Sequence, residues 1–198
     1  ALENYNRSIE LKPDYADAYN NLGNHHQRSQ NHHKAVIAYN KAIALNPDYA
    51  NAYNNLANSQ KGFERYDQAL VNYNRAVKIG PNNAITYQNI GITLYEMNKF
   101  QESLIMSRKA LEILPDCAEA HNNLGVILQY MCKFDEAEDN YKKAIKINPN
   151  YPEAYSNWAL TLMYKGSYKE SFELSEWRWK TKKNKNKKFE TNKPLWNN

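Results

Sequence analysis

The sequence predicts an all-α solenoid built from repeated helical hairpins. Prolines recur at a fixed interval of 34 residues, at Pro13, Pro47, Pro81, Pro115 and Pro149. Between them, apolar and small residues follow the i, i+3, i+4, i+7 spacing of amphipathic helices, twice in each interval. Such a period indicates one supersecondary unit used repeatedly, so that each unit buries its apolar faces on its neighbours.

The recurring proline defines a frame in which it occupies position 32 of each unit. Position 1 is then residue 16, 50, 84, 118 or 152. We expect an array over residues 1–177 and a basic C-terminal cap or linker over 178–198. The array consists of a partial unit 1–15, the full units 16–49, 50–83, 84–117 and 118–151, and a last unit 152–185 that is degenerate at its end.

The first helix of each unit, called helix A, is predicted from an apolar stripe at positions 4, 7, 8 and 11. Position 4 is Tyr19, Tyr53, Tyr87, His121 or Tyr155. Position 8 is always small, which allows a second helix to approach closely. Its residues are Gly23, Ala57, Gly91, Gly125 and Ala159.

The second helix, called helix B, is predicted from a stripe at positions 20, 24, 27 and 28. Position 20 is alanine or serine, and position 24 is Tyr39, Tyr73, Ser107, Tyr141 or Ser175. The proline at position 32 ends helix B because it has no N–H to donate and clashes with the preceding turn. An Asp or Asn follows each proline, and we expect it to cap the next helix A: Asp14, Asp48, Asn82, Asp116 and Asn150.

This frame resembles the tetratricopeptide repeat (TPR), which has small residues at positions 8 and 20 and proline at position 32. The resemblance covers about residues 1–180. It implies a right-handed superhelix of helical hairpins, with the A helices lining the concave side. It also implies a module that binds a protein or peptide segment there, rather than an enzyme.

Charge is concentrated at one end of the chain. The net charge is +5, yet residues 178–198 carry eight basic residues against Glu190, so the remainder carries −2. The sequence has no apolar run long enough to predict a membrane span or a signal peptide. The chain lacks an initiator Met and its first helix A, so we interpret it as a fragment. Two cysteines, Cys117 and Cys132, are interpreted as incidental thiols, compatible with a cytoplasmic location.

Position 6 is the strongest candidate for function, because it is asparagine in all five units: Asn21, Asn55, Asn89, Asn123 and Asn157. A carboxamide offers one acceptor and two donors, so it can hold the N–H and C=O of an extended peptide. Asparagine is common throughout this chain, however, and Asn-Asn pairs occur at 20–21, 54–55, 82–83 and 122–123. A structural or compositional origin of the row therefore stays open.

The asparagine row resembles the ladder in the TPR arm of O-linked N-acetylglucosamine transferases. That resemblance implies binding of a protein backbone at the five asparagines of the row. Other groove positions change from polar to apolar or aromatic along the array. The further candidate contacts are Asn24 and Asn58 at position 9, Tyr95 at position 12 and Tyr130 at position 13. A ligand with a hydrophobic segment at one end would suit this change, and so would another part of the protein covering the apolar end.

Other sites receive less support from the sequence. The basic clamp of chaperone-binding TPR domains is missing, because position 5 is Asn, Gln or Ser and position 6 is never Arg. His25, His26, His32 and His33 could suggest a metal site, but His26 and His32 occupy packing positions. No phosphate loop, nucleophile motif or spaced Cys/His set is present, so we expect neither a cofactor nor catalysis from this chain.

The C-terminal segment leaves the repeat pattern. Trp177, Arg178 and Trp179, followed by Pro194 and Trp196, resemble the junction between TPRs and a glycosyltransferase domain in bacterial proteins. That resemblance implies that the array is the substrate-recognition arm of a larger enzyme whose catalytic domain lies beyond residue 198. The lysine-rich run between these residues could instead bind phosphates or an anionic surface, or serve as a solvated linker.

Overall fold

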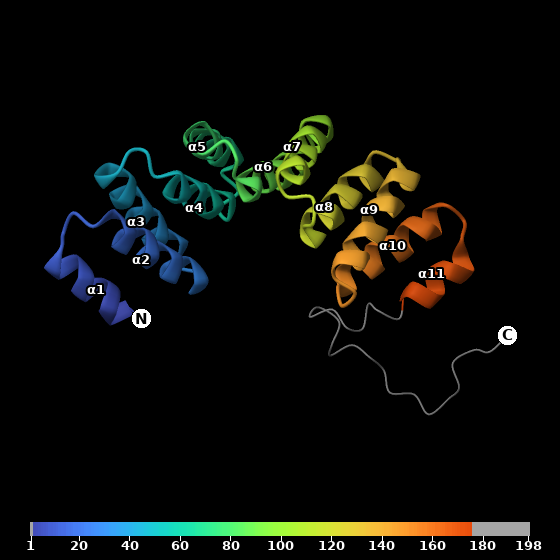
Figure 1. Ribbon diagram of the computed structural model, residues 1–198, viewed down its shortest axis with the longest axis horizontal. Coiled ribbons are helices and arrows are strands. Elements are labelled where there is room, and N and C mark those ends of the chain that lie inside the picture. The colour runs from blue at the N-terminus through green and yellow to red at the C-terminus, as the bar shows by residue number, and fades with distance from the viewer. Residues whose placement is uncertain (1, 176–198) are drawn as a thin grey trace, which may run out of the picture. The chain divides into compact units, whose positions relative to one another are not determined.

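The computed structural model describes residues 2–175, which form eleven α-helices and no strand (Figure 1). The chain divides into two compact units, residues 1–115 and 116–198. In the first unit the helices are α1 (Leu2–Leu11), α2 (Ala16–Arg28), α3 (His32–Leu45), α4 (Ala50–Lys61), α5 (Tyr66–Ile79), α6 (Ala84–Glu96) and α7 (Phe100–Ile113). In the second unit they are α8 (Ala118–Tyr130), α9 (Phe134–Ile147), α10 (Pro152–Tyr164) and α11 (Tyr168–Ser175).

Each complete repeat forms a hairpin of two packed helices, as the sequence predicts. The pairs are α2 with α3, α4 with α5, α6 with α7, α8 with α9, and α10 with α11. Within residues 2–115 the A helices α2, α4 and α6 contact one another in succession, whereas the B helices α3, α5 and α7 do not. The A helices are therefore the tighter, inner layer of this unit, and the B helices form its outer layer.

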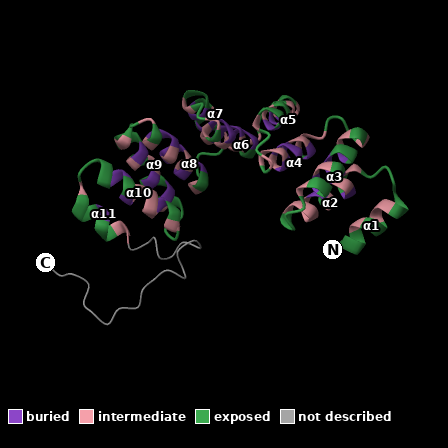
Figure 2. Ribbon diagram, turned by 180° about the vertical axis from the view of Figure 1, so that it is seen from behind, coloured by how far each residue is buried: buried purple, intermediate pink, exposed green. Residues whose placement is uncertain are grey.

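The small residue at position 8 permits close packing inside each hairpin. A Cβ atom added at Gly125 would lie 2.6 Å from the ring of Tyr141, and one added at Gly23 would collide with the ring of Tyr39. The tyrosines at position 24, Tyr39, Tyr73 and Tyr141, are completely buried. The helices therefore meet through an aromatic ring that lies against the backbone. Figure 2 shows the buried residues of the helices in purple.

The turn between helices A and B has one recurring backbone feature that the sequence analysis missed. Position 15 adopts a left-handed conformation in every repeat. Its residues and φ angles are Gln30 (57°), Glu64 (59°), Asn98 (59°), Cys132 (58°) and Gly166 (81°). The next residue closes a Schellman-type bond to the helix that has just ended, as in Asn31 N to His26 O at 2.8 Å. Gly166 and Asn98 are the residue types that this conformation favours, whereas Gln30, Glu64 and Cys132 are not.

The prolines end the B helices, but the prediction for the A-helix caps is wrong. Four B helices end two residues before their proline, at Leu45, Ile79, Ile113 and Ile147. The capping position of the next helix is residue 34 of the frame, not the residue that follows the proline. Only Asn83 at that position accepts a bond from the helix, from Thr86 N at 3.2 Å. Tyrosine or cysteine occupies it elsewhere and forms no side-chain bond to the helix.

Two remaining features of the described residues complete the fold. Cys117 is half-buried at the start of α8 and Cys132 is exposed in the turn before α9, and both are free thiols. None of the helices in residues 2–175 is long and apolar enough to span a membrane.

Candidate functional site

The asparagine row at position 6 bonds to the array itself. The Asn55 side chain donates from Nδ2 to Asn20 Oδ1 and to Asn24 Oδ1, both at 3.0 Å. The same bond to position 5 of the preceding repeat recurs as Asn89 Nδ2 to Asn54 Oδ1 (3.1 Å) and Asn157 Nδ2 to Asn122 Oδ1 (3.0 Å). Three of the five predicted contacts therefore already use at least one donor to tie neighbouring A helices together.

The acceptors of these bonds are residues that the sequence analysis did not single out. Asn20, Asn54 and Asn122, at position 5, are buried. A buried carboxamide without a partner costs about 1–3 kcal/mol, so the bond from the following repeat satisfies an obligatory requirement. The Asn-Asn doublets contained part of this signal: the first members Asn20, Asn54 and Asn122 accept from the next repeat, whereas among the second members only Asn55 donates to the previous one within the described residues.

In the first two repeats, the chain of hydrogen bonds between these asparagines extends to Tyr49 and Asp17. The Asn20 side chain is hydrogen-bonded to the Tyr49 hydroxyl, and Tyr49 in turn donates to Asp17 Oδ1 at 2.5 Å. Burial, together with the bond to Asp17, raises the pKa of Tyr49 to about 12. In the second unit Tyr151 is similarly bonded to Asn122, and burial with the nearby Glu119 raises its pKa to about 12. Both hydroxyls therefore stay protonated at neutral pH.

The position-9 asparagines are held from behind by the buried tyrosines at position 24. The Tyr73 hydroxyl donates to Asn58 Oδ1 at 2.6 Å. The Tyr39 hydroxyl lies 2.9 Å from Asn24 Oδ1 and 2.8 Å from Gln27 Oε1, so its single proton serves one of them at a time. The amino groups of Asn24 and Asn58 have no hydrogen-bond partner among the described residues. Each is a half-buried donor whose orientation is fixed through its carbonyl oxygen.

The third repeat has serines where the first two have alanine and tyrosine in helix B. These serines are Ser103 and Ser107. Ser103 Oγ donates to Gly91 O at 2.7 Å. Thr93 Oγ1 donates to Asn89 O at 2.8 Å, and the Asn89 side-chain oxygen accepts no bond within the described residues. Tyr95 is half-buried, with its ring centroid 5.8 Å from that of Phe100. The third repeat therefore presents the side-chain oxygen of Asn89 as an acceptor and the ring of Tyr95. The first two repeats present the amide donors of Asn24 and Asn58 instead.

The second unit carries the remaining predicted contacts. Asn123 is half-buried, Tyr130 is exposed, and Asn157 is bonded as described above. Asn21, in the first unit, is exposed and has no bond in the described residues. The structure therefore brings Asn21, Asn24, Asn55, Asn58, Asn89 and Tyr95 together in one unit, and Asn123, Tyr130 and Asn157 in the other.

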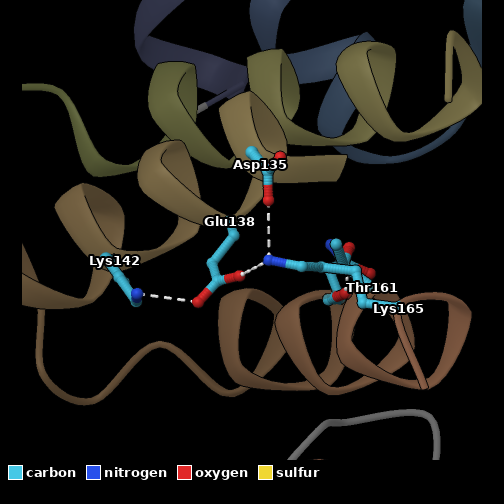
Figure 3. Close-up of polar contacts among 6 residues, drawn as sticks. Asp135, Glu138, Lys142, Thr161 and Lys165 are labelled. Atoms are coloured by element: carbon cyan, nitrogen blue, oxygen red, sulfur yellow. Dashed lines mark hydrogen bonds and ion pairs between the residues drawn. The ribbon is translucent and has the colours of Figure 1, made fainter. Parts of the chain in front are cut away.

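Ion pairs join α9 and α10 in the second unit (Figure 3). The Lys165 ammonium lies 2.8 Å from Asp135 Oδ1 and 2.6 Å from Glu138 Oε2, and Lys142 lies 2.7 Å from Glu138 Oε1. Partial burial opposes ionisation of Glu138, but the bonds from Lys142 and Lys165 outweigh it and lower its pKa. Beside this cluster, Thr161 Oγ1 donates to Gln129 Oε1 at 2.8 Å.

The histidines take part in aromatic packing. The rings of His32 and His33 lie 5.5 Å and 4.8 Å from that of Phe63, and those of His25 and His26 lie 5.8 Å apart. Burial lowers the pKa of His26, with Lys34 contributing. No group of three or more His, Cys, Asp or Glu side chains within residues 2–175 could hold a metal ion. The predicted glycosyltransferase junction and basic tail, residues 177–198, lie outside the described residues.

Comparison with known proteins identifies the family. The tetratricopeptide-repeat models match residues 14–81 and 48–116, and a further match covers 118–151. The chain belongs to the tetratricopeptide-repeat family, and the predicted all-α solenoid of TPR hairpins is confirmed. As a class, such repeats form protein-interaction scaffolds. No curated protein matches the chain.

Solved structures of TPR proteins share the fold. YrrB, described as a TPR protein with an unusual peptide-binding site, is 23% identical with a TM-score of 0.70, over 91% of this chain and 93% of that one. PilF of Pseudomonas aeruginosa is 24% identical with a TM-score of 0.77, over 82% and 74%. MamA is 20% identical with a TM-score of 0.71, over 84% and 98%. At these identities the likeness establishes the fold alone.

Proposed function

We propose that the A-helix layer of residues 2–115 binds the backbone of an extended peptide. The observation that carries this proposal is the pair Asn24 and Asn58. Their oxygens are held by buried tyrosine hydroxyls, while their amino groups are left without a partner in the described residues. A donor fixed in this way loses little conformational freedom when a peptide carbonyl accepts from it.

The spacing of these groups suits a peptide backbone. Equivalent A helices in contact lie roughly 10 Å apart. An extended chain advances about 3.3–3.6 Å per residue, so successive repeats would contact about every third residue. Asn24 and Asn58 would donate to peptide carbonyls, and the Asn89 oxygen would accept from a peptide N–H. Because the groups that are bound belong to the backbone, recognition would depend only weakly on the peptide sequence.

The position-6 asparagines have a divided role in this proposal. Both N–H groups of Asn55 are used within the array, so its contribution is to fix Asn20 and Asn24. Asn21 and Asn123, without bonds in the described residues, and the oxygens of Asn89 and Asn157 stay as candidate peptide contacts. Tyr95 and Tyr130 would pack against peptide side chains, each within its own unit.

The test replaces a donor without disturbing the scaffold. Asn24→Asp with Asn58→Asp keeps an oxygen for each tyrosine hydroxyl and removes each amino group. The probe is a fluorescein-labelled peptide of about twelve residues, long enough for three or four repeats. It is selected on the full chain by phage display. Loss of two bonds of about 0.5–1.5 kcal/mol each predicts a Kd about 5- to 150-fold weaker by fluorescence anisotropy.

The matched control is Asn40→Asp with Asn74→Asp, the same change on exposed residues of the outer layer. It introduces the same charge and should leave the affinity within about twofold. Circular dichroism on all variants checks that the helices are retained. Equal peptide affinity of the Asn24/Asn58 variant and the Asn40/Asn74 variant would contradict the proposal.

Two narrower functions rest on residues outside the described range. A substrate-recognition arm of a glycosyltransferase is supported by the resemblance of Trp177, Arg178, Trp179, Pro194 and Trp196. Binding of an anionic surface or nucleic acid is supported by the lysine run. Deleting residues 178–198 separates anionic-surface binding from groove binding, because peptide affinity should survive the deletion, whereas tail-mediated binding should disappear together with its steep salt dependence.

A further inference from the structure

The outer face of the first unit carries a row of exposed aliphatic side chains. Ile37 on α3, Val71 on α5 and Ile105 on α7 occupy position 22 of their repeats and are 70%, 69% and 59% exposed. The same position in the second unit is Asp139 on α9 and Glu173 on α11, both exposed. Isolated exposed aliphatic residues are ordinary. One at the same position of three consecutive repeats forms an apolar row, which indicates an interaction surface.

A row of basic residues runs beside it. Lys41, Arg75 and Lys109 lie four residues after the aliphatic positions, hence on the same face of each B helix. On the opposite flank, four residues earlier, the residues are mixed in character: His33, Asp67 and Gln101. The outer face therefore pairs an apolar stripe with positive charge along one side only.

Two of the basic groups are held in place by the array. The Arg75 guanidinium lies 5.9 Å from the Tyr53 ring centroid and 3.6 Å from Asp48 Oδ1. The Lys109 ammonium lies 5.4 Å from the Tyr87 ring centroid. Lys41 is exposed and has no charged or hydrogen-bonding partner in the described residues. The cation–π contact of Lys109 leaves its charge uncompensated, and Asp48 pairs with Arg75 only through an exposed carboxylate, so the row keeps a net positive charge.

We propose that this surface docks an amphipathic helix of a partner protein, with acidic residues along one side of its apolar stripe. The B helices α3, α5 and α7 make no contact with one another, so they lie farther apart than helices in direct contact, which are about 8–10 Å apart. Residues seven apart on a helix are separated by about 10.5 Å. A helix lying across α3, α5 and α7 would contact the three aliphatic residues with side chains at least seven residues apart, with its acids facing Lys41, Arg75 and Lys109. This surface is separate from the A-helix layer and does not depend on peptide binding there.

The experiment uses the full chain and synthetic helical peptides. The acidic probe has leucine at every seventh position and glutamate on one side of the leucines, over three heptads. A matched peptide replaces each glutamate by lysine. We expect micromolar binding of the acidic peptide by fluorescence anisotropy, weakening with salt, and at least tenfold weaker binding of the lysine peptide.

Variants of the protein locate the contact. Ile37→Asn with Val71→Asn and Ile105→Asn should weaken the acidic peptide at least tenfold, because each buried aliphatic contact is lost. Lys41→Glu should weaken it about threefold, and more at low salt. The matched control is Ile85→Asn, an equally exposed aliphatic residue on the A helix α6, which should change nothing.

Several results would overturn the proposal. The first is that the acidic peptide does not bind at concentrations up to millimolar. The second is that the acidic and lysine peptides bind with equal affinity. The third is that the triple variant binds the acidic peptide as tightly as the unmodified protein. A dimer in sedimentation experiments that the triple variant abolishes would assign the row to a second copy. Row-dependent binding to phosphatidylserine vesicles without peptide binding would assign it to a membrane surface.

Discussion

The second and third repeats differ at the centre of the hairpin, and the difference explains the change in the groove. In repeat 50–83 the buried Tyr73 fills the space between the helices, and its hydroxyl donates to Asn58 on helix α4. In repeat 84–117 Ser107 takes the tyrosine position and Ile92 takes that of Asn58. The core there contains Ile90 and Leu94 instead, packed against the preceding repeat.

The pattern holds through the whole array. Every repeat with tyrosine at position 24 provides an amide oxygen to its hydroxyl: Asn24 and Gln27, Asn58, and Gln129 at 3.2 Å. Both repeats with serine there have apolar or aromatic residues at positions 9 and 12: Ile92 and Tyr95, and Leu160 and Met163. An amide at position 9 or 12 therefore accompanies the buried tyrosine in each complete repeat that has one, although Val126 at position 9 of the fourth repeat is apolar.

The largest expected effect concerns the tyrosine ring. Tyr73→Ala removes a fully buried aromatic side chain, and we expect a loss of about 3–5 kcal/mol in the free energy of unfolding. Ser107→Ala, the same position in the next repeat, should cost less than about 1.5 kcal/mol. Urea denaturation followed by circular dichroism measures both. Similar costs at the two positions would show that the two hairpin types do not differ in the way proposed.

The next effect isolates the inter-repeat amide bond. Asn55→Ala removes the donor to Asn20 and Asn24 and leaves the buried Asn20 oxygen with one partner fewer, at a cost of about 1–3 kcal/mol. Asn21→Ala is the matched control, because Asn21 occupies the same position and has no bond in the described residues. Thermal unfolding should separate the two variants. Equal stability would mean that the bonds from Asn55 contribute nothing.

A smaller effect tests the hydroxyl alone. Tyr73→Phe keeps the ring and leaves Asn58 without its donor, so we expect a loss of about 0.5–1.5 kcal/mol. Combining it with Asn58→Leu should recover part of that loss, since both polar partners are then removed. A double-mutant cycle measures the coupling. Additive costs would show that the two side chains act independently.

The smallest effect compares these neutral bonds with the ion pairs between α9 and α10. The pKa of Glu138 is lowered, so its contribution is present above pH 4.5, the ordinary value, and is lost as the pH falls through the lowered pKa. We expect Glu138→Gln to reduce the free energy of unfolding by about 1 kcal/mol or less at pH 7, and the difference to shrink below pH 4. Tyr73→Phe should show no such pH dependence. An undiminished difference at low pH would exclude the ion pairs as its source.

Local sequence determined the hairpins and the family. The 34-residue period, the small residue at position 8 and the proline at position 32 act through backbone geometry and close packing. These effects are the same in every repeat, so they can be read from one chain. The capping prediction failed because helix A begins one residue later than the Asp or Asn after proline requires, so that tyrosine occupies the capping position in the first two repeats.

Only the tertiary structure decided which amides are available. The sequence presented five identical asparagines, but the bond from Asn55 to Asn20 joins residues 35 positions apart, on helices whose contact no local pattern describes. Burial then makes that bond obligatory, because a buried carboxamide without a hydrogen-bond partner lowers the free energy of unfolding by about 1–3 kcal/mol. The amino groups of Asn24 and Asn58 stay available because only their side-chain oxygens are bonded within the described residues, whereas Asn55 uses both of its N–H groups inside the array.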